Sequence, residues 1–162
     1  MKNINKLIQP GRVHRSVYTD SEIYDAEMEN IFRANWVFLL HESQIPNVND
    51  FQTIRVGGRP LIVVRKGDDD FQVLLNRCPH RGAKVCRNSS GNSKTFTCPY
   101  HGWKFKNSGK AFVIPGQDAY GDCFDKDSFS MTALPRVESY RGFIFGSGNE
   151  SAVSLEEHLG NA

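Results

Sequence analysis

Short runs of β-branched and aromatic residues, broken by Gly, Pro and Asn-Asp clusters, follow one another along most of the chain. Each run has the length of a strand rather than of a helix, and this pattern is typical of an antiparallel all-β domain. We predict strands at residues 36–40, 51–56, 61–65, 71–76, 93–97, 103–106, 110–114, 136–140 and 142–146. The chain is therefore expected to be mostly β.

Three breaks in this pattern predict tight turns between neighbouring strands. Gly57-Gly58 and Asn107-Ser108-Gly109 each lie between two apolar runs and predict hairpins, because glycine tolerates the positive φ that such turns require. The acidic run Asp68–Asp70 predicts a third, solvated turn.

Before residue 36 the pattern changes to a helical one. Thr19-Asp20-Ser21-Glu22 has the spacing of a capping box, and Tyr24, Met28, Ile31 and Phe32 follow at positions that share one helical face. We expect a helix from about Ser21 to Asn35 that packs on the sheet and carries no chemistry.

Length and composition indicate one folded domain that uses its cysteines as thiols or metal ligands. The 162 residues contain 39% hydrophobic and 23% charged side chains, which is ordinary for a globular chain. The longest apolar runs, Trp36–Leu40 and Leu61–Val64, are far shorter than the roughly 20 residues of a membrane span. No apolar segment follows Lys2 and Lys6 as in a secretory signal, so we expect a cytoplasmic protein in which the four cysteines form no disulfide framework.

Two short motifs place a cysteine and a histidine together, each just after a predicted strand. Cys78-Pro79-His80 and Cys98-Pro99-Tyr100-His101 stand 17 residues apart, and each is followed by glycine, at Gly82 and Gly102. Two loops with one thiolate and one imidazole each suit a two-iron cluster with both sulfurs on one iron and both imidazoles on the other. A mononuclear zinc site is one alternative, although Cys-x-His is tighter than usual zinc spacings. Buried cysteines and satisfied histidines without a metal are the other alternative.

The two motifs resemble the cluster loops of Rieske proteins, specifically those of aromatic-ring-hydroxylating dioxygenase alpha (large) subunits. The likeness includes Cys78–Ala83, Cys98–Trp103, Gly58–Arg65 and Tyr140–Phe145, and it extends from about residue 10 to 160. The resemblance implies a Rieske iron-sulfur fold of stacked antiparallel sheets with an N-terminal helix. It divides the chain into an arm and helix at 1–35, a Rieske domain at 36–150, and a tail at 151–162 at the edge of a catalytic domain outside this sequence.

The same resemblance implies a [2Fe–2S] cluster and the residues around it. The ligands would be Cys78, His80, Cys98 and His101, whereas the residues that shape and shield the pocket would be Arg81, Tyr100 and Trp103. Trp103 as simple core packing is the alternative for that residue. Of the two cysteines left over, Cys86 is expected to be a buried apolar side chain and Cys123 an exposed thiol without a role.

The histidines that remain predict no second metal site in this chain. His14, His41 and His158 lie 27 and 117 residues apart, without the close spacing of a facial triad. By family likeness the mononuclear Fe(II) belongs to the catalytic domain, and this chain alone only transfers electrons. Electrons would arrive from a ferredoxin or a flavin reductase and leave at His101 toward the iron of a neighbouring subunit in a trimer. A free-standing Rieske ferredoxin, or the Rieske part of a monooxygenase or demethylase, is the alternative; we expect neither nucleic acid nor membrane as a partner.

Charge is distributed unevenly around the two motifs. No acidic residue occurs from 71 to 117, although the whole chain has a formal net charge of only +2. Eight basic residues fall in this stretch: Arg77, Arg81, Lys84, Arg87, Lys94, Lys104, Lys106 and Lys110. We call these eight residues the basic collar. We expect it to steer an acidic electron donor or to offset the extra electron on the reduced cluster, and the alternative is a solvated face without a partner.

Overall fold

The computed structural model describes residues 4–161 and has four antiparallel sheets. About 34% of the chain is strand and 22% is helix, so the predicted mostly β class is confirmed. The largest sheet has the order β6-β5-β4-β7, and the other strands form the sheets β11-β12-β3, β10-β9-β8 and β1-β2. The four strands of this largest sheet are β4 (Asp50–Val56), β5 (Arg59–Gly67), β6 (Asp70–Leu75) and β7 (Ser90–Asn92).

The strand β5 lies at the centre of the molecule because it is apolar on both faces. Successive side chains of a strand point to opposite faces. Leu61 and Val63 therefore join one hydrophobic core, while Ile62 and Val64 join the other. The four-stranded sheet thus forms the middle layer between two apolar clusters, which places both cores within one stacked structure.

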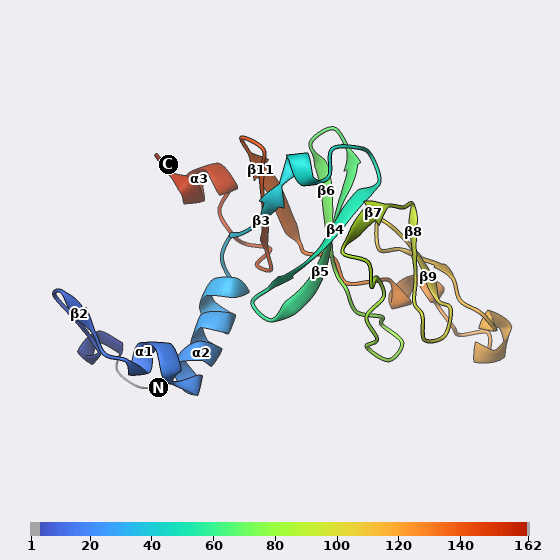
Figure 1. Cartoon of the computed structure of the whole chain (residues 1–162). Helices are drawn as coiled ribbons and strands as arrows, with labels where there is room; N and C mark the ends of the chain where they lie inside the picture. Colours follow the sequence, from blue (N-terminus) through green and yellow to red (C-terminus); the bar gives the residue numbers. More distant parts are fainter. Residues whose placement is uncertain (1–3, 162) are drawn as a thin grey trace.

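One core lies between the middle sheet and the sheet of β3 (Val37–His41), β11 (Arg136–Tyr140) and β12 (Phe143–Ser147). The other core lies beneath the sheet of β8 (Thr95–Thr97), β9 (Lys104–Lys106) and β10 (Ala111–Val113) and includes Cys78, Cys98 and Trp103. The small sheet β8–β10 and both cysteine motifs therefore share a core. This part lies at the end of the molecule opposite the N-terminal arm (Figure 1).

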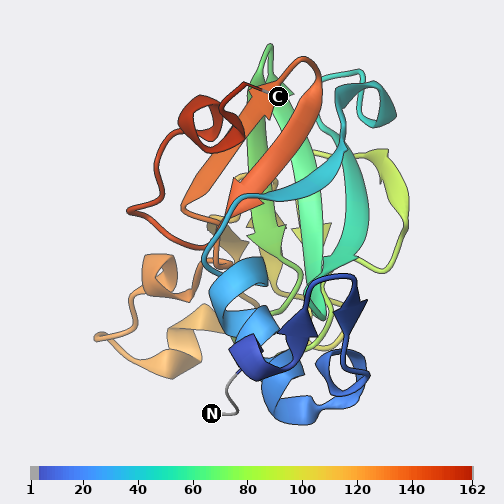
Figure 2. The same ribbon diagram turned by 90° about the vertical axis from the view of Figure 1, so that its left-hand side faces the viewer.

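Residues 4–35 form an arm beside the layered body (Figures 1 and 2). It contains the hairpin β1 (Ile8–Gln9) and β2 (Arg12–Val13), then α1 (Ser16–Thr19), α2 (Ser21–Glu27) and the π-helical turn η2 (Met28–Phe32). The 3₁₀ turns are η1 (Ile4–Lys6), η3 (Glu42–Gln44), η4 (Gln117–Tyr120) and η5 (Lys126–Phe129), and the last helix is α3 (Leu155–Leu159).

The predicted packing face of the N-terminal helix is wrong. The helix starts at Ser21 as expected, with Asp20 as its cap, but Tyr24, Ile31 and Phe32 are exposed and Ile23 is the buried residue. The turn Met28–Phe32 is π-helical and has more residues per turn than an α-helix, so Ile31 and Phe32 leave the face predicted with α-helical periodicity. The helix also ends at Phe32 rather than Asn35.

Most predicted strands lie within a residue or two of the observed ones. The hairpins at Gly57-Gly58 and Asn107–Gly109 and the turn at Asp68–Asp70 are confirmed. The strand predicted at 93–97 is shorter, because Ser93 turns the chain between β7 and β8 and its hydroxyl donates to the Thr95 carbonyl at 2.6 Å. The strands β1, β2 and β7 and the helix α3 were not predicted. The division of the chain at residues 35 and 150 stays a prediction.

Within residues 4–161, no helix combines the length and the apolar character that crossing a membrane requires.

Candidate metal centre

Two six-residue loops at the β8–β10 end of the molecule have the same pattern of backbone hydrogen bonds and the same backbone conformation at their glycine. In the first loop, 78–83, the Cys78 N–H donates to the Ala83 carbonyl at 2.8 Å and the Gly82 N–H donates to the Cys78 carbonyl at 2.8 Å. In the second loop, 98–103, Cys98 donates to Trp103 at 2.7 Å and Gly102 donates to Cys98 at 3.0 Å. Each loop therefore closes on its own cysteine, and its glycine has the same positive φ, 73° at Gly82 and 71° at Gly102.

The two loops bring the cysteines together and, separately, the histidines together. Cys78 and Cys98 are 2% and 1% exposed, both are free thiols, and their side chains are in hydrogen-bonding contact. The rings of His80 and His101 lie 4.6 Å apart between centroids. Across the part of the chain that the structure describes, no side chain or carbonyl hydrogen-bonds a ring nitrogen of either histidine. The four predicted ligands thus form two separate pairs, one of sulfurs and one of imidazoles.

The predicted neighbours of the cluster differ in how they contact it. Trp103 is 2% exposed and stacks on His80 with the rings nearly parallel, 4.8 Å apart at 3°. The ring of Tyr100 is exposed and stacks on His101 at 3.9 Å. Arg81 directs its backbone N–H to the Cys78 thiol, while its side chain is exposed. Trp103 also belongs to the hydrophobic core, so packing and contact with the site occur together at this residue.

Burial sets the protonation of the two groups in the first loop. It raises the pKa of the Cys78 thiol, and the backbone N–H groups of His80 and Arg81, which donate to the sulfur, act in the opposite direction. Burial, together with the charges of His101 and Arg81, lowers the pKa of His80. The neutral imidazole, which is the form that binds a metal, is therefore favoured.

The donor set fits a two-iron cluster better than one metal ion. Among residues 4–161, no three His, Cys, Asp or Glu side chains gather as ligands of a single ion. A tetrahedral zinc ion requires all four side chains at one point. In a Rieske cluster each iron takes only two protein ligands, and the paired arrangement of thiols and imidazoles suits that demand.

The other predicted residues stand outside the two pairs, although Arg77 and Arg81 of the basic collar border the first loop. His14 and His41 have their ring nitrogens engaged by Ser16 and Ser43. Cys86 is buried and Cys123 is exposed, as expected. All eight residues of the basic collar are exposed, and Lys110 pairs with Asp127 at 3.0 Å.

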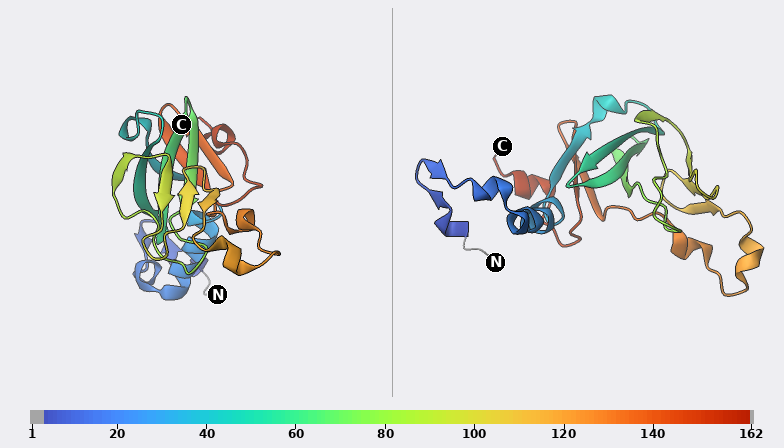
Figure 3. Two further views of the ribbon diagram at one scale, coloured as in Figure 1. Left: turned by 90° about the vertical axis from the view of Figure 1, so that its right-hand side faces the viewer. Right: turned by 60° about the horizontal axis from the view of Figure 1, so that its bottom comes forward.

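Sequence reasoning missed Asn76, which lies two residues before Cys78 at the end of β6. It is 1% exposed and forms three side-chain hydrogen bonds to residues 85 and 86. A polar residue directly after a buried apolar strand was the available signal. It also missed the aromatic cluster of Tyr120, Phe124 and Phe129 that packs around Trp103. The cluster belongs to the segment that contains η4 and η5, which projects from the β8–β10 end of the molecule (Figure 3).

Residues 35–141 match the family model described as the Rieske [2Fe-2S] domain. The chain therefore belongs to the Rieske [2Fe–2S] family, as its two loops indicate. It is 45% identical over 154 residues to the large subunit of 2-halobenzoate 1,2-dioxygenase from Burkholderia cepacia, covering 93% of this chain and 33% of the relative. It is 42% identical over 159 residues to the alpha subunit of N,N-dimethyl phenylurea N-demethylase from Sphingobium sp., covering 98% and 35%.

Solved structures agree with these sequence matches. Naphthalene 1,2-dioxygenase from Rhodococcus sp., bound to indole, superposes with a TM-score of 0.86 at 39% identity, covering 99% of this chain and 37% of the other. The chain spans about a third of the length of the curated relatives that it matches and corresponds to their N-terminal part.

Proposed function

We propose that this chain transfers single electrons through a [2Fe–2S] cluster held by Cys78, His80, Cys98 and His101. It would serve as the electron-entry part of an aromatic-ring-hydroxylating oxygenase. The observation that carries this proposal is the separate pairing of two buried thiols and two imidazoles by loops of one backbone form. When bound, such a cluster exchanges one electron at a higher potential than an all-cysteine plant-type cluster.

The residues of the two loops divide the work of holding and exposing the centre. The buried Cys78 and Cys98 exclude water from the sulfur side, and the N–H groups of His80 and Arg81 favour the thiolate form of Cys78. Trp103 covers the face of His80. His101 is exposed, so its ring offers the path for an electron to leave the protein.

The partners of the chain follow from the family. A ferredoxin or a flavin reductase would supply the electron, and the basic collar would attract an acidic donor surface. The acceptor would be the mononuclear Fe(II) of an oxygenase catalytic domain, in the same or a neighbouring subunit of a trimer. The matched relatives include a dioxygenase and an N-demethylase, and this chain matches about a third of the length of each.

Metal analysis and spectroscopy of anaerobically prepared protein test this proposal. We expect two iron and two acid-labile sulfide per chain, and an electron paramagnetic resonance signal that appears on one-electron reduction. Nitrogen hyperfine coupling from two imidazoles distinguishes this cluster from an all-cysteine one. Protein that binds one zinc and no sulfide would contradict the proposal.

Matched variants distinguish the proposed ligands from cysteines and histidines that do not bind the cluster. Cys98→Ser and His80→Ala should lose the cluster. Cys123→Ser and His158→Ala change the same residue types outside the two loops, so they should retain it in full.

A further inference from the structure

The two loops return to the body of the protein in different ways. The second loop lies between β8 and β9, whose residues Phe96 and Thr97 pair with Phe105 and Lys104. Strand hydrogen bonds therefore hold both of its ends. The first loop leaves from β6, but the chain returns through residues 84–89 without regular structure before β7 starts at Ser90.

The side chain of Asn76 takes the place of strand hydrogen bonds in this returning segment. Its Oδ1 accepts from the Val85 N–H at 3.0 Å and from the Cys86 N–H at 2.8 Å, and its Nδ2 donates to the Cys86 carbonyl at 2.8 Å. Its own backbone N–H donates to the Pro60 carbonyl of β5 at 2.8 Å. One buried side chain thus ties the far side of the loop to the middle sheet.

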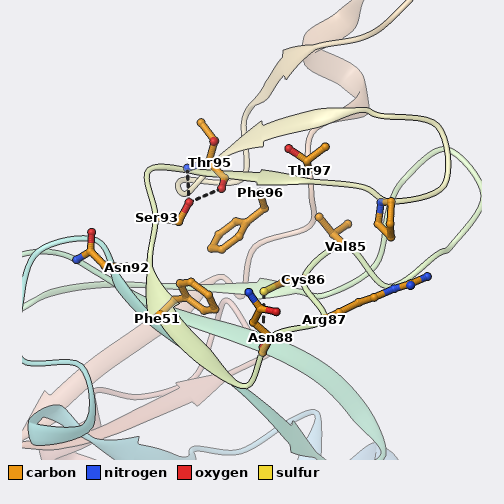
Figure 4. Close-up of a pocket in the computed structure, with 12 residues that line it drawn as sticks. Phe51, Val85, Cys86, Arg87, Asn88, Asn92, Ser93, Thr95, Phe96 and Thr97 are labelled. Atoms are coloured by element: carbon orange, nitrogen blue, oxygen red, sulfur yellow. Dashed lines mark hydrogen bonds between the residues drawn. The ribbon is translucent and has the colours of Figure 1, made fainter.

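Few other polar contacts support residues 84–87. Within residues 4–161, no backbone–backbone hydrogen bond involves these four residues, and the next anchor is Thr53 of β4, whose hydroxyl donates to the Asn88 carbonyl at 2.9 Å. On the side facing β8, Val85, Cys86 and Arg87 border an open hollow of about 430 Å³ (Figure 4). Val85 and Cys86 are nonetheless 3% and 7% exposed and belong to the hydrophobic core, so packing and the Asn76 hydrogen bonds act together on this segment.

We infer that Asn76 is a positioning residue, which holds the first loop so that Cys78 and His80 keep the geometry of the metal centre. This inference rests on the proposed cluster. The backbone N–H groups of His80 and Arg81 act on the Cys78 sulfur, and a shift of the loop would move them relative to it. Hydrogen bonds to cluster sulfurs stabilise the extra negative charge of the reduced state, so loss of the Asn76 contacts lowers the reduction potential.

Two substitutions of Asn76 in the full chain separate hydrogen bonding from volume. Asn76→Leu fills the same space but removes all three hydrogen bonds. We expect it to release iron and sulfide at least about tenfold faster than wild type, with a more negative potential and an altered paramagnetic resonance spectrum. Asn76→Asp keeps the two accepted hydrogen bonds but replaces the donor to the Cys86 carbonyl by a second oxygen, which the carbonyl repels. The rate at which this variant releases iron and sulfide should therefore fall between those of wild type and Asn76→Leu.

Asn107→Ala is the matched control. Asn107 is half-buried and its side chain donates to Asn49 Oδ1 at 2.8 Å, away from the two loops. We expect this variant to lose thermal stability while its potential and spectrum stay those of wild type. If the Asn76 variants likewise lose stability but keep the wild-type potential, spectrum and release rate, then Asn76 is only a structural residue and the inference is wrong.

Hydrogen exchange of the metal-free chain tests the contact without the cluster. In Asn76→Leu, which removes the acceptor of both N–H groups, the Val85 and Cys86 amides should exchange faster than in wild type, while the Val63 amide in the core is unchanged. Unchanged protection of Val85 and Cys86 would overturn the inference even if the cluster forms. Wild-type protein that assembles no cluster would instead overturn the proposed function, whatever the exchange result.

Discussion

The two loops share a backbone but differ in what supports them and in what they expose. The Asn76 side chain holds the returning segment of the first loop, and the histidine of this loop contacts the rings of Trp103 and His101. The second loop is supported by a strand pair, and its histidine is exposed and stacks on the exposed ring of Tyr100. The comparison indicates that a firmly supported loop can present its ligand at the surface, whereas a loop held by one side chain keeps its ligand covered.

Removal of the Trp103 ring should have the largest effect on the difference between the two loops. Trp103→Ala removes a buried ring that packs on His80, Tyr120 and Phe129, and deletions of this kind cost about 3–5 kcal/mol in the free energy of unfolding. Denaturant unfolding measures the loss. Trp103→Phe keeps a ring over His80, so it should recover part of the stability and most of the cluster content. If Trp103→Ala had wild-type stability, the first loop would not depend on the ring that stacks on His80.

The loop glycines should respond nearly alike, because their φ angles agree. An alanine at Gly82 or Gly102 must adopt a left-handed conformation, which costs about 1–2 kcal/mol. At Gly82 a Cβ would also lie 2.9 Å from Arg77 Nε, whereas at Gly102 the nearest atom, Pro115 Cγ, is at 3.5 Å. Gly82→Ala should therefore be slightly worse in denaturant unfolding, and adding Arg77→Ala should remove the difference. A large difference that survives the double substitution would contradict a shared backbone form.

The sequence predicted the parts of the fold that depend on local patterns. The apolar run of β5, the glycine turns and the two cysteine motifs each carry their signal within a few residues. The contacts that depend on distant residues were not predictable in this way. Asn76 bonds residues nine and ten positions along the chain, and the aromatic cluster at Trp103 comes from a segment without regular periodicity. The exposed side chains of α2 and η2 show the same limit, because an apolar stripe indicates burial without indicating what covers it.

Ionic strength should affect reduction of the cluster through the basic collar, four of whose members lie in residues 77–87 around the first loop. We expect the rate of reduction by dithionite, an anion, to fall several-fold between low and high salt. Lys84→Gln should reduce this salt dependence. Lys6→Gln makes the same charge change on the N-terminal arm and should leave it unchanged (Figure 1). If the rate of reduction of the wild type did not change with ionic strength, the basic collar would be a solvated face that attracts no anionic donor.

Tyr100→Ala should have the smallest effect and sharpen the contrast with Trp103. Tyr100 is 59% exposed and contacts His101 through one stacked ring at 3.9 Å. Its removal should change the free energy of unfolding by less than about 1 kcal/mol. Cluster content should stay that of wild type, because β8 and β9 hold the loop without the ring. Since the substitution widens access to His101, reduction by dithionite should become no slower. If Tyr100→Ala lost the cluster as readily as Trp103→Ala, the second loop would depend on its aromatic cover as much as the first, and strand pairing would not explain why His101 can remain exposed.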